Sequence, residues 1–230
     1  MQVAIFGSGA RGTSDKLSDF DIIAVLDENE ITHKDHAISL LKSQIVENAS
    51  ISVYGKLRYR QMLESGSPFV WHIFLEHKPL QPYSNDIFKL TPNPYITAHQ
   101  DVEKMFCILK ASRKSLINTR HSTIYEAGLH YVCARNIAMF ASKILIEKFD
   151  FSRKSPFSLN PVITFPLSEE EYNEILLARL ASTRGFAPPI LDHSLTVHWS
   201  NLLIKWADFI LTSIRREDNL VRPISASSCH

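Results

Sequence analysis

The chain has 230 residues, of which 45% are hydrophobic, and its formal net charge is +1 at pH 7. This length can bury a sizeable core, and the near-neutral charge argues against extended binding of DNA or RNA. The sequence has neither an apolar run long enough to span a bilayer nor an N-terminal signal segment, and its three widely spaced cysteines indicate a reducing compartment, so we expect a cytoplasmic protein.

A buried strand followed by a glycine turn opens the chain. Residues 2–6 form an apolar run with β-branched members, which predicts a strand that ends at Gly7. Gly7 and Gly9 lack side chains where a backbone would approach phosphate oxygens, and Ser8 adds a hydroxyl donor. The turn therefore favours an anionic ligand.

Two aspartates stand at the start of the next apolar run, residues 22–26. Strand alternation points Asp19 and Asp21 to the same face. Two neighbouring carboxylates repel each other unless a cation lies between them. Either half alone is most simply an ordinary turn or a pair of solvated carboxylates, but together, with a strand on each side, they indicate a metal-dependent site.

This segment resembles the nucleotidyltransferase superfamily that includes DNA polymerase beta, and within it the small bacterial enzymes of the kanamycin nucleotidyltransferase and minimal nucleotidyltransferase type. The similarity rests on the pattern G-S-x-A-R-G followed by S-D-x-D, which is filled by Gly7, Ser8, Ala10, Arg11, Gly12, Ser18, Asp19 and Asp21. The resemblance implies transfer of a nucleoside monophosphate from an Mg²⁺-bound nucleoside triphosphate, with ATP as the first choice, to a hydroxyl on a small molecule, a protein or RNA. Pyrophosphate would leave.

The same resemblance assigns roles to the residues of the pattern. Asp19 and Asp21 would be catalytic and would bind Mg²⁺. Gly7 and Ser8 would hold the triphosphate. Arg11 would either stabilise phosphate charge or tie the loop to a carboxylate.

A third strand is predicted at residues 50–54, after a helical pattern in residues 31–47. The superfamily usually places a third carboxylate on this strand, and this chain has Ser52 in that place. The alternative function is therefore a catalytically weakened nucleotide-binding or partner-binding protein, such as a toxin–antitoxin or defence component. Glu47 and Glu76 are the nearest replacement carboxylates, although a helix end and a charged turn explain them more simply.

Prolines and asparagines interrupt the pattern at residues 79–94, and we place a domain boundary near residue 95. The predicted fold is α+β, with a small mixed β-sheet nucleotidyltransferase domain at residues 1–95 that has helices on one face. An α-helical bundle domain follows at residues 96–216. Residues 217–230 are polar, and we expect them to be disordered.

One later helix carries clear signals for its start and its end. Ser168 and Glu171 form the sequence pattern of a capping box ahead of apolar positions at helical spacing. Gly185 follows as a stop signal. The pattern predicts a helix between them.

A helix predicted over residues 123–148 is apolar on nearly every face and carries Glu126 and His130 four residues apart. In the kanamycin-type enzymes the acceptor lies between the two domains and a glutamate of the helical domain acts as general base, so the resemblance suggests Glu126. A buried Glu–His pair that satisfies itself is the structural alternative. The same enzymes suggest a homodimer with a shared cleft. The helical toxins that are paired with minimal nucleotidyltransferases use an arginine followed four to six residues later by a histidine for RNA cleavage. This chain has no such pair, so the resemblance disfavours a ribonuclease function.

Overall fold

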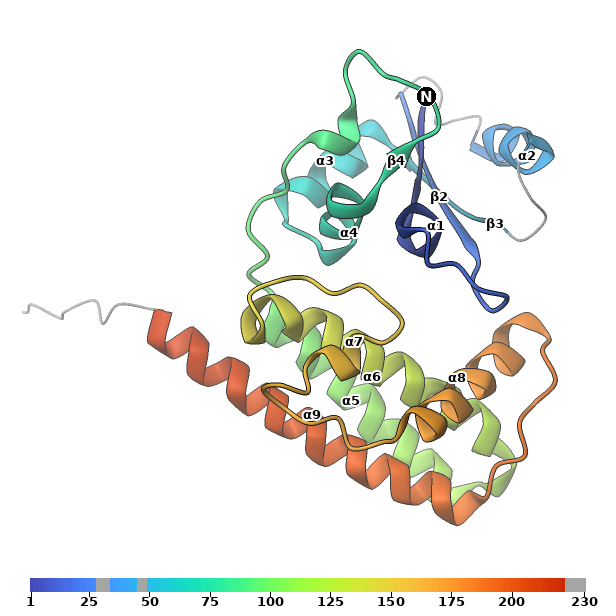
Figure 1. Cartoon of the computed structure of the whole chain (residues 1–230), viewed down its shortest axis with the longest axis vertical. Helices are drawn as coiled ribbons and strands as arrows, with labels where there is room; N and C mark the ends of the chain where they lie inside the picture. The colour runs from blue at the N-terminus through green and yellow to red at the C-terminus, as the bar shows by residue number, and fades with distance from the viewer. Residues whose placement is uncertain (28–33, 45–48, 222–230) are drawn as a thin grey trace, which may run out of the picture. The chain divides into compact units, whose positions relative to one another are not determined.

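The chain divides into two compact units, Met1–Ile96 (unit 1) and Thr97–His230 (unit 2) (Figure 1). The computed structural model describes residues 1–27, 34–44 and 49–221. The boundary predicted near residue 95 is adjacent to this division. No helix within the described ranges is both long enough and apolar enough to cross a membrane.

Unit 1 contains a mixed four-stranded sheet with the strand order β3-β2-β1-β4. Its strands are β1 (Gln2–Phe6), β2 (Phe20–Leu26), β3 (Ala49–Gly55) and β4 (Lys78–Pro79). Its helices are α1 (Gly7–Arg11), α2 (Lys34–Gln44), α3 (Lys56–Glu64), α4 (Pro68–Glu76) and the 3₁₀ helix η2 (Ile87–Lys89). β1 pairs antiparallel with β2 and β4, whereas β2 pairs parallel with β3. A parallel pair requires a crossover connection, which contains α2.

Helices pack on both faces of the sheet, whereas the sequence predicted helices on one face. α3 and α4 cover the face that carries Ile23 and Val25. α2 covers the opposite face, where Leu41 packs with Ile22 and Ala24. Both faces need a cover because all five of these residues are buried, and a strand without a solvated face must be packed on each side.

The segment after β4 returns to the beginning of β1. The side-chain amide of Gln2 donates to the backbone oxygen of Asn85 (2.6 Å), and its Oε1 accepts from the N–H of Ile87 (2.9 Å). The N–H of Val3 donates to the hydroxyl of Tyr83 (2.7 Å). The first strand of the chain is therefore held by residues 80 to 85 positions later.

A glycine between α3 and α4 contacts the segment that leaves unit 1. Gly66 has a φ of +63°, and an added Cβ would lie 2.4 Å from the backbone oxygen of Pro94 and 2.6 Å from that of Asn93. The N–H of Asn93 donates to the Leu63 oxygen (2.9 Å), and its side-chain amide donates to the Glu64 oxygen (2.8 Å). Only glycine combines this backbone conformation with so close an approach.

Unit 2 is helical throughout its regular structure in the described residues. Its helices are α5 (Ala98–Asn118), the 3₁₀ helix η3 (Arg120–Ser122), α6 (Thr123–Leu145), α7 (Ser155–Ser158), α8 (Glu169–Arg184) and α9 (His193–Val221). α6 packs against α5, α8 and α9, as Figure 1 shows, and alanines such as Ala134 and Ala138 are fully buried. α9 reaches Val221, inside the range predicted to be disordered, and residues 222–230 lie outside the described residues.

α8 begins at the predicted capping box. The N–H of Glu171 donates to Ser168 Oγ (3.2 Å), and the N–H of Ser168 donates to Glu171 Oε2 (2.8 Å). Glu171 Oε1 also accepts from the indole N–H of Trp199 on α9 (2.9 Å). One carboxylate therefore caps a helix and joins two helices, and Gly185 ends α8 with a φ of +70°.

Candidate functional site

The glycine segment and Asp21 meet at one end of β1 and β2. Phe6 pairs with Asp21 across the antiparallel ladder, which places Gly7 beside Asp21. An added Cβ on Gly7, whose φ is +68°, would lie 2.9 Å from Asp21 Oδ2. The Asp21 carboxylate therefore occupies the space that a side chain at position 7 would need.

A short helix, α1, stands where the sequence predicted a turn. Gly7 begins this helix, so the N–H groups of its first turn lack intrahelical acceptors. The sequence predicted that Gly9 makes room for phosphate, but an added Cβ there would lie 3.3 Å from the side chains of Ile5 and Phe20. The absence of a side chain at Gly9 lets α1 pack closely against the sheet.

Asp15 organises the loop that leads to the two candidate metal ligands. Its carboxylate accepts from the N–H of Leu17 (3.0 Å) and from the hydroxyl of Ser18 (2.8 Å). Sequence reasoning missed Asp15, although aspartate often accepts from the N–H two residues later in loops. Asp19, at the end of this loop, and Asp21, in β2, are both half-buried.

Arg11 is paired with a carboxylate of α4. Its Nη1 donates to Glu76 Oε2, which lies 2.8 Å from His72 Nε2. The exposed fractions of the Arg11, Glu76 and His72 side chains are 27%, 14% and 12%, so the cluster is only partly shielded from water. This contact ties α1 to α4, which is one of the two roles predicted for Arg11.

The pairing also assigns a place to one of the candidate replacement carboxylates. Glu76 contacts Arg11, whereas Glu47 lies outside the described residues. His72 and Glu76 are four residues apart on α4, which is the spacing of neighbours on one helix face. That spacing was the available sequence signal for this cluster.

β3 brings serines to the face of the sheet that carries Asp21. The parallel register pairs Asp21 with Ser50 and Ile23 with Ser52. Directly paired residues share a face, so the neighbour of Asp21 is Ser50 rather than the predicted Ser52. No residue of β3 is an aspartate or a glutamate.

The carboxylates of Asp19 and Asp21 are the oxygen ligands that the candidate site offers to a metal ion. Among the described residues, no group of three or more His, Cys, Asp or Glu side chains is placed to hold a metal ion. Asp19 and Asp21 supply carboxylate oxygens, and Mg²⁺ commonly combines one or two carboxylates with phosphate oxygens of a substrate. The residues present therefore fit a single nucleotide-bound Mg²⁺.

Glu126 and His130 lie in the interior of unit 2. Glu126 is 4% exposed and accepts a hydrogen bond from the hydroxyl of Ser112 (2.6 Å). His130 is fully buried, and neither ring nitrogen has a hydrogen-bond partner among the described residues. Burial lowers the pKa of His130 to about 4, so the ring is neutral at pH 7. The two side chains therefore do not form the self-satisfied pair considered above.

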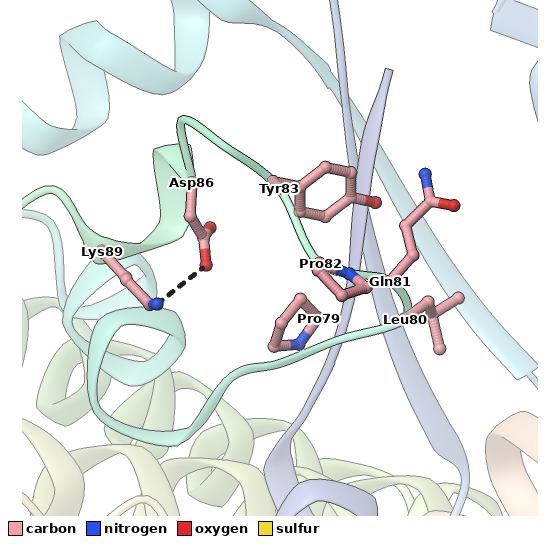
Figure 2. Close-up of a pocket in the computed structure, with 7 residues that line it drawn as sticks. All are labelled: Pro79, Leu80, Gln81, Pro82, Tyr83, Asp86 and Lys89. Atoms are coloured by element: carbon pink, nitrogen blue, oxygen red, sulfur yellow. Dashed lines mark ion pairs between the residues drawn. The ribbon is translucent and has the colours of Figure 1, made fainter.

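A pocket of about 360 Å³ in unit 1 is lined by the segment that follows α4. Figure 2 shows its lining residues, which are Pro79, Leu80, Gln81, Pro82, Tyr83, Asp86 and Lys89. Lys89 Nζ lies 3.9 Å from Asp86 Oδ2, so the two charged groups of the lining compensate each other. None of the glycines or aspartates of the candidate site lines this pocket, and we do not assign the nucleotide to it.

Comparison with known proteins gives one family match, which covers the first part of the chain. Residues 1–66 match the family model of the nucleotidyltransferase domain. No curated protein matches the chain. The matched residues run from β1 to the corner after α3, so they include Gly7, Asp19, Asp21 and all of β3.

Proposed function

We propose that this chain, whose residues 1–66 match the nucleotidyltransferase domain and support membership of the polymerase-beta-like superfamily, moves a nucleoside monophosphate from a nucleoside triphosphate to a hydroxyl acceptor. The observation that carries this proposal beyond the family match is the contact of Gly7 with Asp21. Backbone donors at the start of α1 next to a carboxylate suit a phosphate chain that carries a cation. ATP is the proposed donor.

Four residues of unit 1 have a proposed part in the reaction. The Gly7 and Ser8 N–H groups and the Ser8 hydroxyl bind phosphate oxygens, while Asp19 and Asp21 hold one Mg²⁺. When bound, that ion neutralises phosphate charge during in-line displacement. The acceptor oxygen bonds to the α-phosphorus, the bond to the β-phosphate oxygen breaks, and pyrophosphate leaves.

The acceptor proton needs a base, and Glu126 is the proposed one. Its hydrogen bond from Ser112 fixes the carboxylate, and its burial equally suits a structural role. Glu126→Gln can still accept that hydrogen bond but is a far weaker base. The variant therefore separates the two roles in the assay below.

The test is transfer of label from each α-labelled nucleoside triphosphate, with Mg²⁺ or Mn²⁺. The acceptors offered are the protein itself, cell-extract proteins, RNA and aminoglycosides. We expect transfer by the unaltered chain and a loss of about 100-fold or more in Asp19→Ala/Asp21→Ala, because both carboxylate ligands are gone. We also expect Asp21→Ala alone to abolish Mg²⁺-dependent triphosphate binding.

The matched control is Asp35→Ala, which removes one exposed carboxylate from α2 and should leave transfer unchanged. Unchanged triphosphate affinity in Asp21→Ala would remove the basis of the site assignment. Full transfer by Glu126→Gln would reject Glu126 as the base without affecting the rest of the proposal.

The absence of a carboxylate from β3 favours a second candidate function, a nucleotide-binding or partner-binding protein with weakened turnover. A defence or toxin–antitoxin role falls within this alternative. Aspartate–dependent triphosphate binding without any label transfer would support it over the first proposal.

The register of β3 predicts how a carboxylate could be restored. Ser50→Asp would place it beside Asp21, and Ser52→Asp would place it one pair further along the strand. We expect Ser50→Asp to raise transfer more, by about tenfold, which corresponds to ~1.4 kcal/mol of transition-state stabilisation. A rise with Ser52→Asp alone would contradict this assignment, and the same label assay measures both variants.

A further inference from the structure

A groove on unit 2 gathers cations from two helices. Its volume is about 540 Å³, which falls within the range of small-molecule sites. α5 contributes Lys110 and Arg113, and α9 contributes His198, Asn201 and Lys205 together with two aliphatic residues. No carboxylate from the described part of the chain lines this groove.

Arg113 is fixed across the groove by an amide of the opposite helix. Its Nε donates to Oδ1 of Asn201, 88 positions later in the chain. This bond leaves the two terminal nitrogens of the guanidinium and the NH₂ group of Asn201 as donors. A planar fork of this kind matches two oxygens of one phosphate.

The positive charges of the groove are not compensated by protein carboxylates. Lys110 Nζ lies 4.4 Å from the ring centroid of Phe106, a cation–π contact that holds the ammonium group without neutralising it. Among the described residues, no carboxylate oxygen lies within ion-pair distance of Lys110, Arg113 or Lys205. Three neighbouring cations without counter-charges favour an anion between them.

The uncompensated charge ends further along the same pair of helices. Arg215 of α9 donates to His99 Nε2 (2.6 Å) and lies 3.4 Å from Glu103 Oε1. In this direction the next arginine or lysine of α9 is therefore already paired, and so is Lys104 of α5, whose Nζ lies 3.1 Å from Asp101 Oδ1. A confined cluster suits a compact, highly charged ligand better than a nucleic-acid backbone, which needs an extended basic track.

We propose that this groove binds a small molecule carrying a diphosphate group, separately from the metal-dependent site of unit 1. Arg113 binds one phosphate through its fork, with the Asn201 amide beside it. Lys110 and Lys205 neutralise the remaining charge as point charges. The three permanent positive charges match the charge of about −3 on a diphosphate near neutral pH.

The test is calorimetric titration of the full chain with inorganic pyrophosphate in EDTA, so that metal-dependent binding in unit 1 does not contribute. We expect one pyrophosphate per chain and the same affinity in Asp19→Asn/Asp21→Asn. We expect the affinity for pyrophosphate to fall about tenfold or more in Lys110→Gln/Arg113→Gln/Lys205→Gln, because each charge-assisted hydrogen bond contributes to the binding free energy.

The control is Lys104→Gln/Lys143→Gln/Lys154→Gln, which removes three exposed cations from the same unit outside the groove. It should bind pyrophosphate within twofold of the unaltered chain. Proton resonances of the His198 ring, assigned with His198→Gln, should shift on addition of pyrophosphate. This second readout needs no variant of the three cations and covers the case in which the triple variant fails to fold.

Four results would overturn the proposal. These are equal losses in the two triple variants, full binding in the groove variant, loss of binding in Asp19→Asn/Asp21→Asn, and His198 signals that do not respond. A single-stranded RNA that binds more tightly than pyrophosphate through the same cations would also replace the diphosphate ligand. Failure of label transfer would leave this metal-free binding untouched, so the two proposals fail separately.

Discussion

His130 makes the stability of unit 2 dependent on pH. The pKa of this buried ring is about 4, compared with an ordinary value of 6.5. The ring takes up a proton near pH 6.5 in the unfolded chain but only near pH 4 in the folded chain. Between these two values protonation favours the unfolded chain, so the unfolding free energy is highest above pH 6.5 and decreases as the pH falls toward 4. We expect the unfolding free energy to drop by on the order of 3 kcal/mol across this range from His130 alone.

His130→Leu tests this linkage because leucine keeps an apolar contact surface and cannot be protonated. Urea unfolding curves at several pH values give the unfolding free energy of each protein. The value for the variant minus the value for the unaltered chain should increase from pH 7 to pH 4. His121→Gln changes an exposed histidine and should give a constant difference. Parallel curves for His130→Leu and the unaltered chain would contradict the assignment of this pH dependence to His130.

At the same scale, the sequence predictions for Gly7, Asp19 and Asp21 needed only residues that are close in the chain: the glycine turn after one strand and the alternation at the start of the next. Their roles stay predictions. Arg11 could not be assigned to one role, because its partner Glu76 is 65 positions away and approaches only when α4 packs beside α1. Long-range ion pairs of this kind leave no periodic pattern in the sequence.

Substitutions at two glycines of unit 1 can distinguish the cost of a left-handed backbone from the cost of a steric clash. Gly66 and Gly12 have nearly the same φ, +63° and +74°, but an added Cβ would meet the Pro94 oxygen at 2.4 Å in the first case and nothing within 4 Å in the second. Gly12→Ala should cost about 1 kcal/mol of unfolding free energy for its left-handed backbone. Gly66→Ala should cost at least about 3 kcal/mol because the backbone of the exit segment must also move. Chemical denaturation measures both losses of unfolding free energy. Equal losses would show that the backbone of Asn93 and Pro94 moves away from the added methyl group at little cost.

Elements were predicted best where a short local signal defines them. The strand at residues 2–6 and the capping box of Ser168 and Glu171 agree with the structure because both depend on neighbouring residues. The position of Ser50 beside Asp21 depends on strand register, which is set by packing on both faces of β2. The predicted cover on a single face therefore missed the packing of α2.

At the scale of the whole molecule, the composition allowed either one domain or two small ones, and the run of prolines and asparagines followed by helical patterns was what predicted a second domain. The groove of unit 2 was beyond such reasoning. Arg113 and Asn201 are 88 positions apart, and only the packing of α5 against α9 brings them together. The near-zero net charge of the chain also conceals this local excess of cations, because the sum contains no spatial information.

The hydrogen bonds that fasten β1 also determine when unit 1 can be completed during synthesis. β1 is synthesised before β4, and β4 and the partners of Gln2 and Val3 are made only when translation has reached residues 78–87. Until then one edge of β1 presents unpaired backbone groups, as an open strand edge does. A nascent chain that contains the whole family-matched stretch, residues 1–66, therefore cannot yet form the complete sheet. About twenty more residues must be synthesised before β4 and the segment that follows it can pair with β1.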